Sequence, residues 1–167
     1  DATERIYRYF LHAPRAEIDD DRAREACRRL SIAADFHNFT PDDTGTERTV
    51  SVTARRDGAF LSIECRAGGF ARQLVRRLVG AIAAVGRGDR DVAFLDRALG
   101  PDLLSGPDGI APAAPEPLVL FDVRYPSLAF EIDERAIEDA RGIFESRRRA
   151  RLASARVAGT LVPDQES

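Results

Sequence analysis

The chain has 167 residues, of which 44% are hydrophobic and 32% charged, and its formal net charge is -3 at pH 7. That length and apolar content suit one globular domain with a hydrophobic core. No run of about eighteen apolar residues occurs and no charged-then-apolar leader is seen, so nothing in this sequence marks it for membrane insertion or secretion. We expect a cytoplasmic protein with no membrane partner.

The charged residues are biased in kind. All 25 basic residues are arginine, set against 28 acids, and several acids cluster at 19–21 and 42–43. Such a composition is typical of a GC-rich genome and also suits a high-salt cytoplasm, where an acidic, hydrated surface keeps protein soluble. Methionine is absent, position 1 included. We therefore expect the chain to be a processed or excised piece of a longer protein.

The two cysteines, Cys27 and Cys65, lie in apolar segments without partners at metal-ligand spacing. Buried free thiols are therefore expected, rather than a disulfide or a zinc site. The two histidines complete no ligand cluster, so no metal site is predicted.

Residues 5–13 alternate with period two and are rich in aromatic side chains, which predicts a strand. Residues 19–36 begin with acidic cap candidates and continue as an amphipathic helix. The apolar residues at helical spacing in that helix are Ala23, Cys27, Leu30 and Ala34. Residues 36–47 are rich in Asp, Thr, Pro and Gly, which is typical of a loop.

The clearest hairpin joins strands at 47–55 and 60–67 through an Asp-Gly turn. After Gly68-Gly69 the apolar period becomes helical, and a helix over 70–86 is predicted to end near Gly86. Its apolar stripe consists of Phe70, Leu74, Leu78 and Ile82, widened by Val75, Val79 and Val85.

The rest of the chain contains a short helix over 91–99 capped by Asp91, a loop at 106–117 and a strand at 118–125. A long helix from residue 133 then frays into a polar tail. This order predicts an α+β fold, with an antiparallel or mixed sheet and helices packed on one face, plus a C-terminal tail helix. The expected division is a domain at 1–126 and a helical extension with a polar tail at 127–167.

Residues 66–88 hold five arginines and no acid, although the chain as a whole is acidic. On the predicted helix, Arg72 and Arg76 share a face and Arg77 lies one step round. One interpretation is a solvated polar face. The other is an anion site, because the planar guanidinium binds two oxygens of a carboxylate or phosphate at once. Nucleic acid is the leading anionic candidate.

The stretch "GGFARQLVRRLVGAIAAVGRG" resembles the signature of the TruA family of tRNA pseudouridine synthases. Four other stretches match in the family's order: "RIYRY", "DFHNFT", "ERTVSVTARRDGAFLSIECRAGGF" and "APAAPEPLVLFDVRYP". Together they cover residues 5–126. The family's Arg-Thr-Asp motif, which carries the catalytic aspartate, does not occur, so the resemblance is to the C-terminal half alone. Ala33-Ala34 and Pro117 depart from the family pattern and affect local loop geometry.

The resemblance implies a cofactor-free isomerisation of uridine to pseudouridine in tRNA, in the anticodon arm, with the base drawn out of its stack. In that scheme Tyr7 stacks on the target base, and Arg76 pairs with an aspartate of the missing N-terminal domain. The residues expected to contact RNA phosphates or other RNA groups are Arg5, Arg72, Arg77, His37 and Asn38. The fragment alone should be inactive. Related enzymes are dimers, so a homodimer is a further possibility.

Two other functions, each from a different class of protein, remain open for this chain. The chain could be a stand-alone RNA-binding module with an RNP-like sheet, whose exposed aromatics stack bases without chemistry. It could also be an oligomerisation or scaffold domain whose basic helix meets an acidic partner. Arg76 discriminates between these readings, because a binding module has no need of a single guanidinium at the mouth of a cleft.

Overall fold

The computed structural model describes residues 1–161, which fall into two compact units that meet after Pro126. The first unit contains a four-stranded sheet and three α-helices, and the second contains one long helix. Each unit is described by itself.

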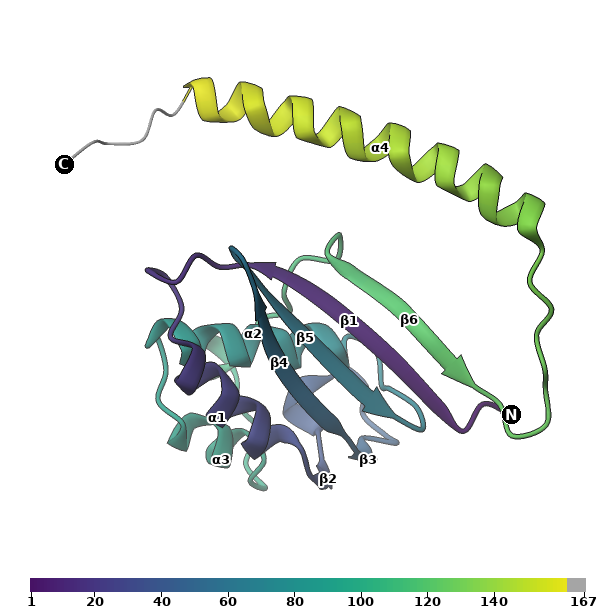
Figure 1. Cartoon of the computed structure of the whole chain (residues 1–167). Helices are drawn as coiled ribbons and strands as arrows, with labels where there is room; N and C mark the ends of the chain where they lie inside the picture. Colours follow the sequence, from purple (N-terminus) through teal and green to yellow (C-terminus); the bar gives the residue numbers. More distant parts are fainter. Residues whose placement is uncertain (162–167) are drawn as a thin grey trace. The chain divides into compact units, whose positions relative to one another are not determined.

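The sheet consists of β1 (Glu4–His12), β4 (Ser51–Asp57), β5 (Phe60–Ala67) and β6 (Leu118–Arg124). Its order is β4-β5-β1-β6, and every neighbouring pair is antiparallel (Figure 1). Side chains in β5 alternate, so Leu61, Ile63 and Cys65 are buried while polar residues between them face the other way. One face of the sheet therefore belongs to the core, and the other carries polar residues together with exposed aromatic side chains such as Phe10 and Phe121.

Three helices cover the apolar face of this sheet: α1 (Asp20–Leu30), α2 (Leu74–Arg87) and α3 (Ala93–Ala98) (Figure 1). Asp19 caps α1, since its carboxylate accepts from the N–H groups of Asp21 and Arg22 at 2.8 and 2.9 Å. Most residues of α2 are buried. The predicted α+β architecture, with helices on one face of the sheet, is confirmed.

The predicted helix over 19–36 is too long. It ends at Leu30, where the Ser31 hydroxyl lies 2.8 Å from the Cys27 carbonyl and accepts from the Val52 N–H at 2.8 Å. A hydroxyl that bonds the preceding turn and the adjacent strand stops the helix. Ala34, expected on the helix, lies instead in β2 (Ala33–Asp35), which pairs antiparallel with β3 (Glu47–Thr49).

The start of α2 also differs from the prediction. Gln73 has a φ of 60° and is the one non-glycine residue among 1–161 with positive φ, so the helix begins at Leu74 rather than at residue 70. The Arg72 N–H and Nε hold this turn by donating to the Asp42 carboxylate at 2.9 and 3.1 Å. The expectation that Arg72 and Arg76 share a helix face is therefore wrong.

The predicted β4-β5 hairpin is confirmed, but its two turn residues are Gly58 and Ala59 rather than Asp57 and Gly58, because Asp57 still pairs with Phe60. Gly58 has a φ of 57°, which suits glycine at the first turn position. The Asp91 carboxylate also acts as expected, accepting the Phe94 N–H at 2.8 Å. The predicted strand over 47–55 is instead two strands, because residues 47–49 pair with β2 while β4 pairs with β5.

In the second unit, α4 (Glu134–Leu161) has no buried residue. The tail helix is thus confirmed, and the polar end of the chain at 162–167 lies outside the described residues. None of the helices within residues 1–161 combines the length and apolar character needed to cross a bilayer.

A segment at 109–114 runs along α2 in close contact with it. The Ala113 N–H donates to the Arg76 carbonyl at 2.9 Å, and Arg76 Nε donates back to the Ala113 carbonyl at 2.6 Å. A Cβ on Gly80 would lie 2.2 Å from the Ala111 carbonyl oxygen. Only glycine allows the two backbones to approach this closely.

Replacing Gly80 with alanine should lower the free energy of unfolding by about 1–3 kcal/mol, because the added methyl must push backbone aside. Gly142→Ala is the matched control, since a Cβ there meets nothing within 4 Å. Urea unfolding followed by circular dichroism measures both. Equal midpoints for the two variants would contradict the close approach.

Gln73→Val should destabilise the chain by about 1–3 kcal/mol, because a β-branched residue strongly disfavours positive φ. Gln73→Gly should be tolerated, since glycine adopts this conformation at no steric cost. Thermal unfolding of the two variants side by side provides the measurement. A valine variant as stable as the glycine variant would mean that Gln73 is not left-handed.

Candidate active site

A cavity of about 330 Å³ lies at the N-terminal end of α2. Its walls come from β1, from the turn before α2, from the first residues of that helix and from the start of β6. The residues that line it are Tyr7, Phe70, Ala71, Arg72, Gln73, Leu74, Val75, Arg76 and Leu118. Segments more than a hundred residues apart in sequence thus share one wall.

Tyr7 reaches the cavity from β1 and is half-buried. Its position in the strand is opposite Cys65 of β5, a buried residue, so its side chain is on the helix-covered face of the sheet. The ring meets Phe70 edge to face, with ring centroids 5.3 Å apart and planes at 89°. This is a favourable aromatic geometry that fixes the orientation of the Tyr7 ring.

Arg76 enters the same cavity from the first turn of α2 and is also half-buried. The double hydrogen bond with Ala113 holds its Nε and its backbone carbonyl. No acid within residues 1–161 forms an ion pair with Arg76. A guanidinium has five N–H donors, so the donors of Arg76 other than its Nε–H can bind an anion that enters the cavity.

Two other arginines predicted to bind RNA lie at or next to the cavity. Arg72 lines it while bound to Asp42, and the Arg72 N–H, followed by its guanidinium, lowers the pKa of that carboxyl group. The Arg72 side chain is 66% exposed, so it can also reach solvent. Arg5 donates to the Gly68 carbonyl at 2.5 Å and so supports the turn that leads to Phe70.

Arg77 is directed away from this cavity. Its Nη1 donates to the Ile110 carbonyl at 2.6 Å, and its Nε is buried without a hydrogen-bond partner among the described residues. It therefore holds the 109–114 segment against α2. Its position in the sequence, one residue after Arg76, gave no sign of this difference.

His37 and Asn38 do not line the cavity either. Asn38 is buried; its Nδ2 donates to the carbonyls of Ala98 and Asp102 at 3.0 and 2.9 Å, and its Oδ1 accepts from Leu104 at 2.8 Å. Its amide thus ties the loop after β2 to the residues around α3. His37 Nδ1 lies 3.3 Å from the Asp35 carboxylate.

Phe70, Gln73 and Leu118 line the cavity although sequence reasoning assigned them no role there. Phe70 belonged to the apolar stripe of the predicted helix and Leu118 to an ordinary strand. No local signal marked either residue, because the cavity forms only when β1, β6 and α2 come together.

The lining of the cavity carries positive charge. Two arginines and no acid are found among its lining residues. Residues 1–161 contain no group of three or more His, Cys, Asp or Glu side chains that could hold a metal ion. The cysteines are buried and free, as expected, and burial raises the pKa of Cys27 to about 12, which favours its protonated form.

Comparison with known proteins shows the family of the chain. The family model described as tRNA pseudouridine synthase matches residues 26–126. The chain is 64% identical over 165 residues to the tRNA pseudouridine synthase A of Natronomonas pharaonis, covering 99% of this chain and 62% of that protein. It is 52% identical over 165 residues to the protein of the same name from Haloarcula marismortui, covering 95% and 60%.

A third relative, the tRNA pseudouridine synthase A of Halobacterium salinarum, is 48% identical over 162 residues, covering 96% of this chain and 60% of that protein. The chain thus spans about 60% of the length of the curated relatives it matches. These relatives come from halophilic archaea, which agrees with the acidic composition that suggested a high-salt cytoplasm. The family match extends over more than half of its residues, and the chain belongs to the tRNA pseudouridine synthase family.

Proposed function

We propose that this chain supplies the C-terminal half of an active site that isomerises uridine to pseudouridine in the anticodon arm of tRNA. Tyr7 stacks on the target uracil, and Arg76 binds the catalytic carboxylate, which a part of the enzyme beyond this chain provides. The observation that carries the proposal is the meeting of Tyr7 and Arg76 in one cavity without an acid in its lining.

Arg76 has a definite task in the mechanism that the family resemblance implies. An aspartate attacks or deprotonates the nucleoside, the glycosidic bond breaks, and the uracil turns and rejoins through carbon. A guanidinium bonded to that aspartate keeps it ionised and oriented. The Arg76–Ala113 hydrogen bonds support this role, because they restrain the arginine before any carboxylate arrives.

Tyr7 has the complementary task of holding the base. A uridine must leave its stack before its glycosidic bond can be attacked, and an aromatic ring replaces the lost stacking. The edge-to-face contact with Phe70 supports this assignment, because it orients the ring in advance. No cofactor is needed in this scheme.

Around the cavity, Arg72 and Arg5 are the arginines best situated to contact RNA phosphates. Arg77, His37 and Asn38 are assigned a lesser part, since hydrogen bonds or an ion pair within the fold engage their side chains. The partners are then tRNA and the remaining part of the same enzyme, in the cytoplasm where tRNA is modified. A homodimer stays a prediction.

A second candidate function, an RNA-binding module without catalysis, is favoured by the helix-free face of the sheet. Phe10 and Phe121 on that face are 44% and 53% exposed, as base-stacking aromatics would be. However, the Arg8 guanidinium already lies 3.4 Å from the Phe121 ring centroid. This contact occupies one face of the ring, so the Tyr7 cavity is the stronger candidate.

The 167-residue chain alone should form no pseudouridine in a tRNA anticodon arm, because the catalytic carboxylate is absent. Adding a separately made polypeptide with the rest of the enzyme should restore the reaction, and Arg76→Gln should abolish it. Arg76→Lys should remain impaired, since an ammonium lacks the planar fork. Release of tritium from uridine labelled at C5 reports the reaction. Pseudouridine formed by the chain alone would contradict the proposal, because a carboxylate of this chain would then have to serve as the catalytic group.

Tyr7→Ala should weaken binding of the chain to a uridine-containing anticodon-arm RNA by about 5- to 100-fold, the range expected for loss of one stacked base. Tyr7→Phe keeps the ring and should bind within about twofold of the unchanged chain. Phe10→Ala, on the opposite face of the sheet, serves as the control in fluorescence anisotropy titrations. Weaker binding by Phe10→Ala with no effect of Tyr7→Ala would favour the RNA-binding module.

A further inference from the structure

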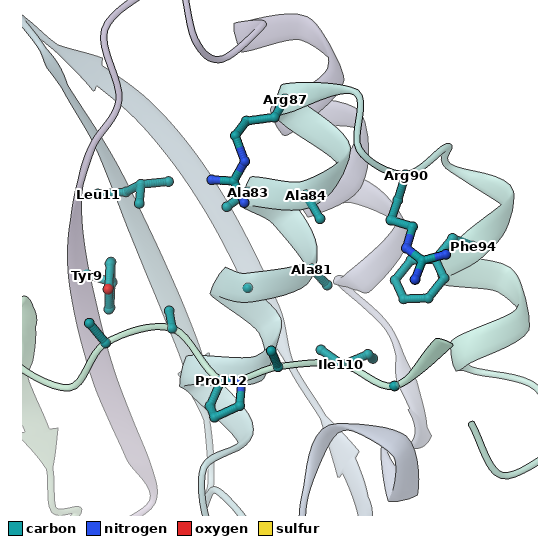
Figure 2. Close-up of a pocket in the computed structure, with 15 residues that line it drawn as sticks. Tyr9, Leu11, Ala81, Ala83, Ala84, Arg87, Arg90, Phe94, Ile110 and Pro112 are labelled. Atoms are coloured by element: carbon teal, nitrogen blue, oxygen red, sulfur yellow. The ribbon is translucent and has the colours of Figure 1, made fainter. Parts of the chain in front are cut away.

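A second cavity, of about 450 Å³, lies between β1, α2 and the 109–114 segment (Figure 2). It shares no lining residue with the Tyr7 cavity but adjoins it: Ala113 lines the second cavity and is hydrogen-bonded to Arg76, which lines the first. The two cavities therefore follow one another along α2. Nothing in the proposed reaction uses the second.

The walls of this cavity are made of small residues. On α2 they are Gly80, Ala81, Ala83 and Ala84, and on the facing segment they are Gly109, Ala111, Ala113 and Ala114. Figure 2 shows Ile110 and Pro112 along one side and Tyr9 and Leu11 along another. Because α2 and the 109–114 segment touch at Gly80 and Ala111, their methyl groups and backbone form one continuous side of the cavity, and Tyr9 and Leu11 of β1 line another side. The space between them is a slot that suits a flat, largely apolar group.

Tyr9 brings a polar group to the slot. The residue is only 3% exposed and lines the cavity, so its hydroxyl is a polar group that a molecule in the slot can reach. Burial raises the pKa of Tyr9, so the phenol stays protonated and can donate as well as accept. A ligand with a polar edge can therefore form a hydrogen bond with this hydroxyl inside the slot.

Two arginines, Arg87 and Arg90, also line the cavity, and Figure 2 shows them on different sides of it. Arg87 Nε is 2.8 Å from Asp89, in a pair whose side chains are 44% and 59% exposed. Arg90 lies 4.9 Å from the Phe94 ring centroid, is 3.4 Å from Asp108, and donates to the Pro107 carbonyl. The exposed Arg87–Asp89 pair is weak, so the Arg87 guanidinium can turn toward a phosphate, while Arg90 keeps its contacts and adds positive charge to the cavity wall.

We propose that this second cavity binds one unpaired nucleotide of the bound RNA, other than the target uridine. The base enters the alanine-walled slot and its polar edge meets the Tyr9 hydroxyl, while its phosphate contacts Arg87 and is attracted by the charge of Arg90. The inference rests on the proposed function, because that function brings RNA to the neighbouring cavity. A nucleotide matches all three features together: a flat ring, a hydrogen-bonding edge and an anionic group.

The first test is a nuclear magnetic resonance titration of the unchanged chain with a single-stranded anticodon-arm RNA. Saturable shifts are expected for the amides of residues 80–87 and 109–114, in addition to those around Tyr7. A separate titration with uridine monophosphate and adenosine monophosphate distinguishes binding of free nucleotides from binding of RNA. Shifts in these segments with the mononucleotides but none with RNA would overturn the assignment to bound RNA.

The second test fills the slot. Ala84→Leu should weaken RNA binding about tenfold, and Tyr9→Phe, which removes only the hydroxyl, should weaken it about threefold. Ala150→Leu, the same change at an exposed position of α4, should have no effect. Circular dichroism checks folding, and the titration of the unchanged chain does not depend on any variant.

The outcomes separate this inference from the proposed function. RNA affinities unchanged by Ala84→Leu and Tyr9→Phe, with no shifts in 80–87 or 109–114, would overturn the nucleotide site while Tyr7→Ala could still weaken binding. Loss of the Tyr7→Ala effect would instead contradict the proposed active site. Tenfold weaker binding by Ala84→Leu, with Ala150→Leu unaffected, supports the second site.

Discussion

The position of Arg76 beside Tyr7 depends on the contact between α2 and the 109–114 segment. Gly80 lets the two backbones approach, and the paired hydrogen bonds between Arg76 and Ala113 join them at the end nearer β6. Because the arginine is one member of this pair, the contact that closes the fold also restrains the guanidinium beside Tyr7. A looser contact would release Arg76 and merge the two cavities, so packing and chemistry are linked at this point.

Ion pairing within the chain also distinguishes Arg76 from arginines such as Arg56. Most ion pairs lie on the surface, where they contribute little and weaken further in concentrated salt. The Arg56–Asp20 pair is an exception, with side chains only 9% and 11% exposed, and its hydrogen bond lowers the pKa of Asp20. Arg76 has no such partner within residues 1–161. In a protein with 28 acids, a half-buried arginine without an acidic partner in the described residues stands out, and it is the feature on which the proposed carboxylate partner rests.

Backbone strain and aromatic packing prepare the first cavity in advance. The left-handed Gln73 turns the chain sharply between Arg72, which binds Asp42, and the helix that carries Arg76. The turn leaves Phe70 outside the helix and against the ring of Tyr7. Residues in such sparsely populated conformations cluster at functional sites, where the surrounding structure holds them in place. Because the Tyr7 ring and the Arg76 guanidinium are already ordered, less conformational entropy is lost when a partner binds to them.

Local patterns determined the elements of this protein: the alternation in β1 and β5, the hairpin turn that contains Gly58, the cap at Asp19 and the apolar stripe of α2 were all readable, because each depends on near neighbours. The family resemblance, and not these local patterns, predicted a role for Tyr7 on the target base and for Arg76 on a carboxylate, and both roles stay predictions. What only the tertiary structure decided was where polar groups find distant partners. Ser31 ends α1 by bonding β4, Asp42 and Gln73 delay α2, and Arg77 and Asn38 bind carbonyls more than thirty residues away. Hydrogen bonds of such long range leave no periodic trace in a sequence, since they form only when the chain has folded.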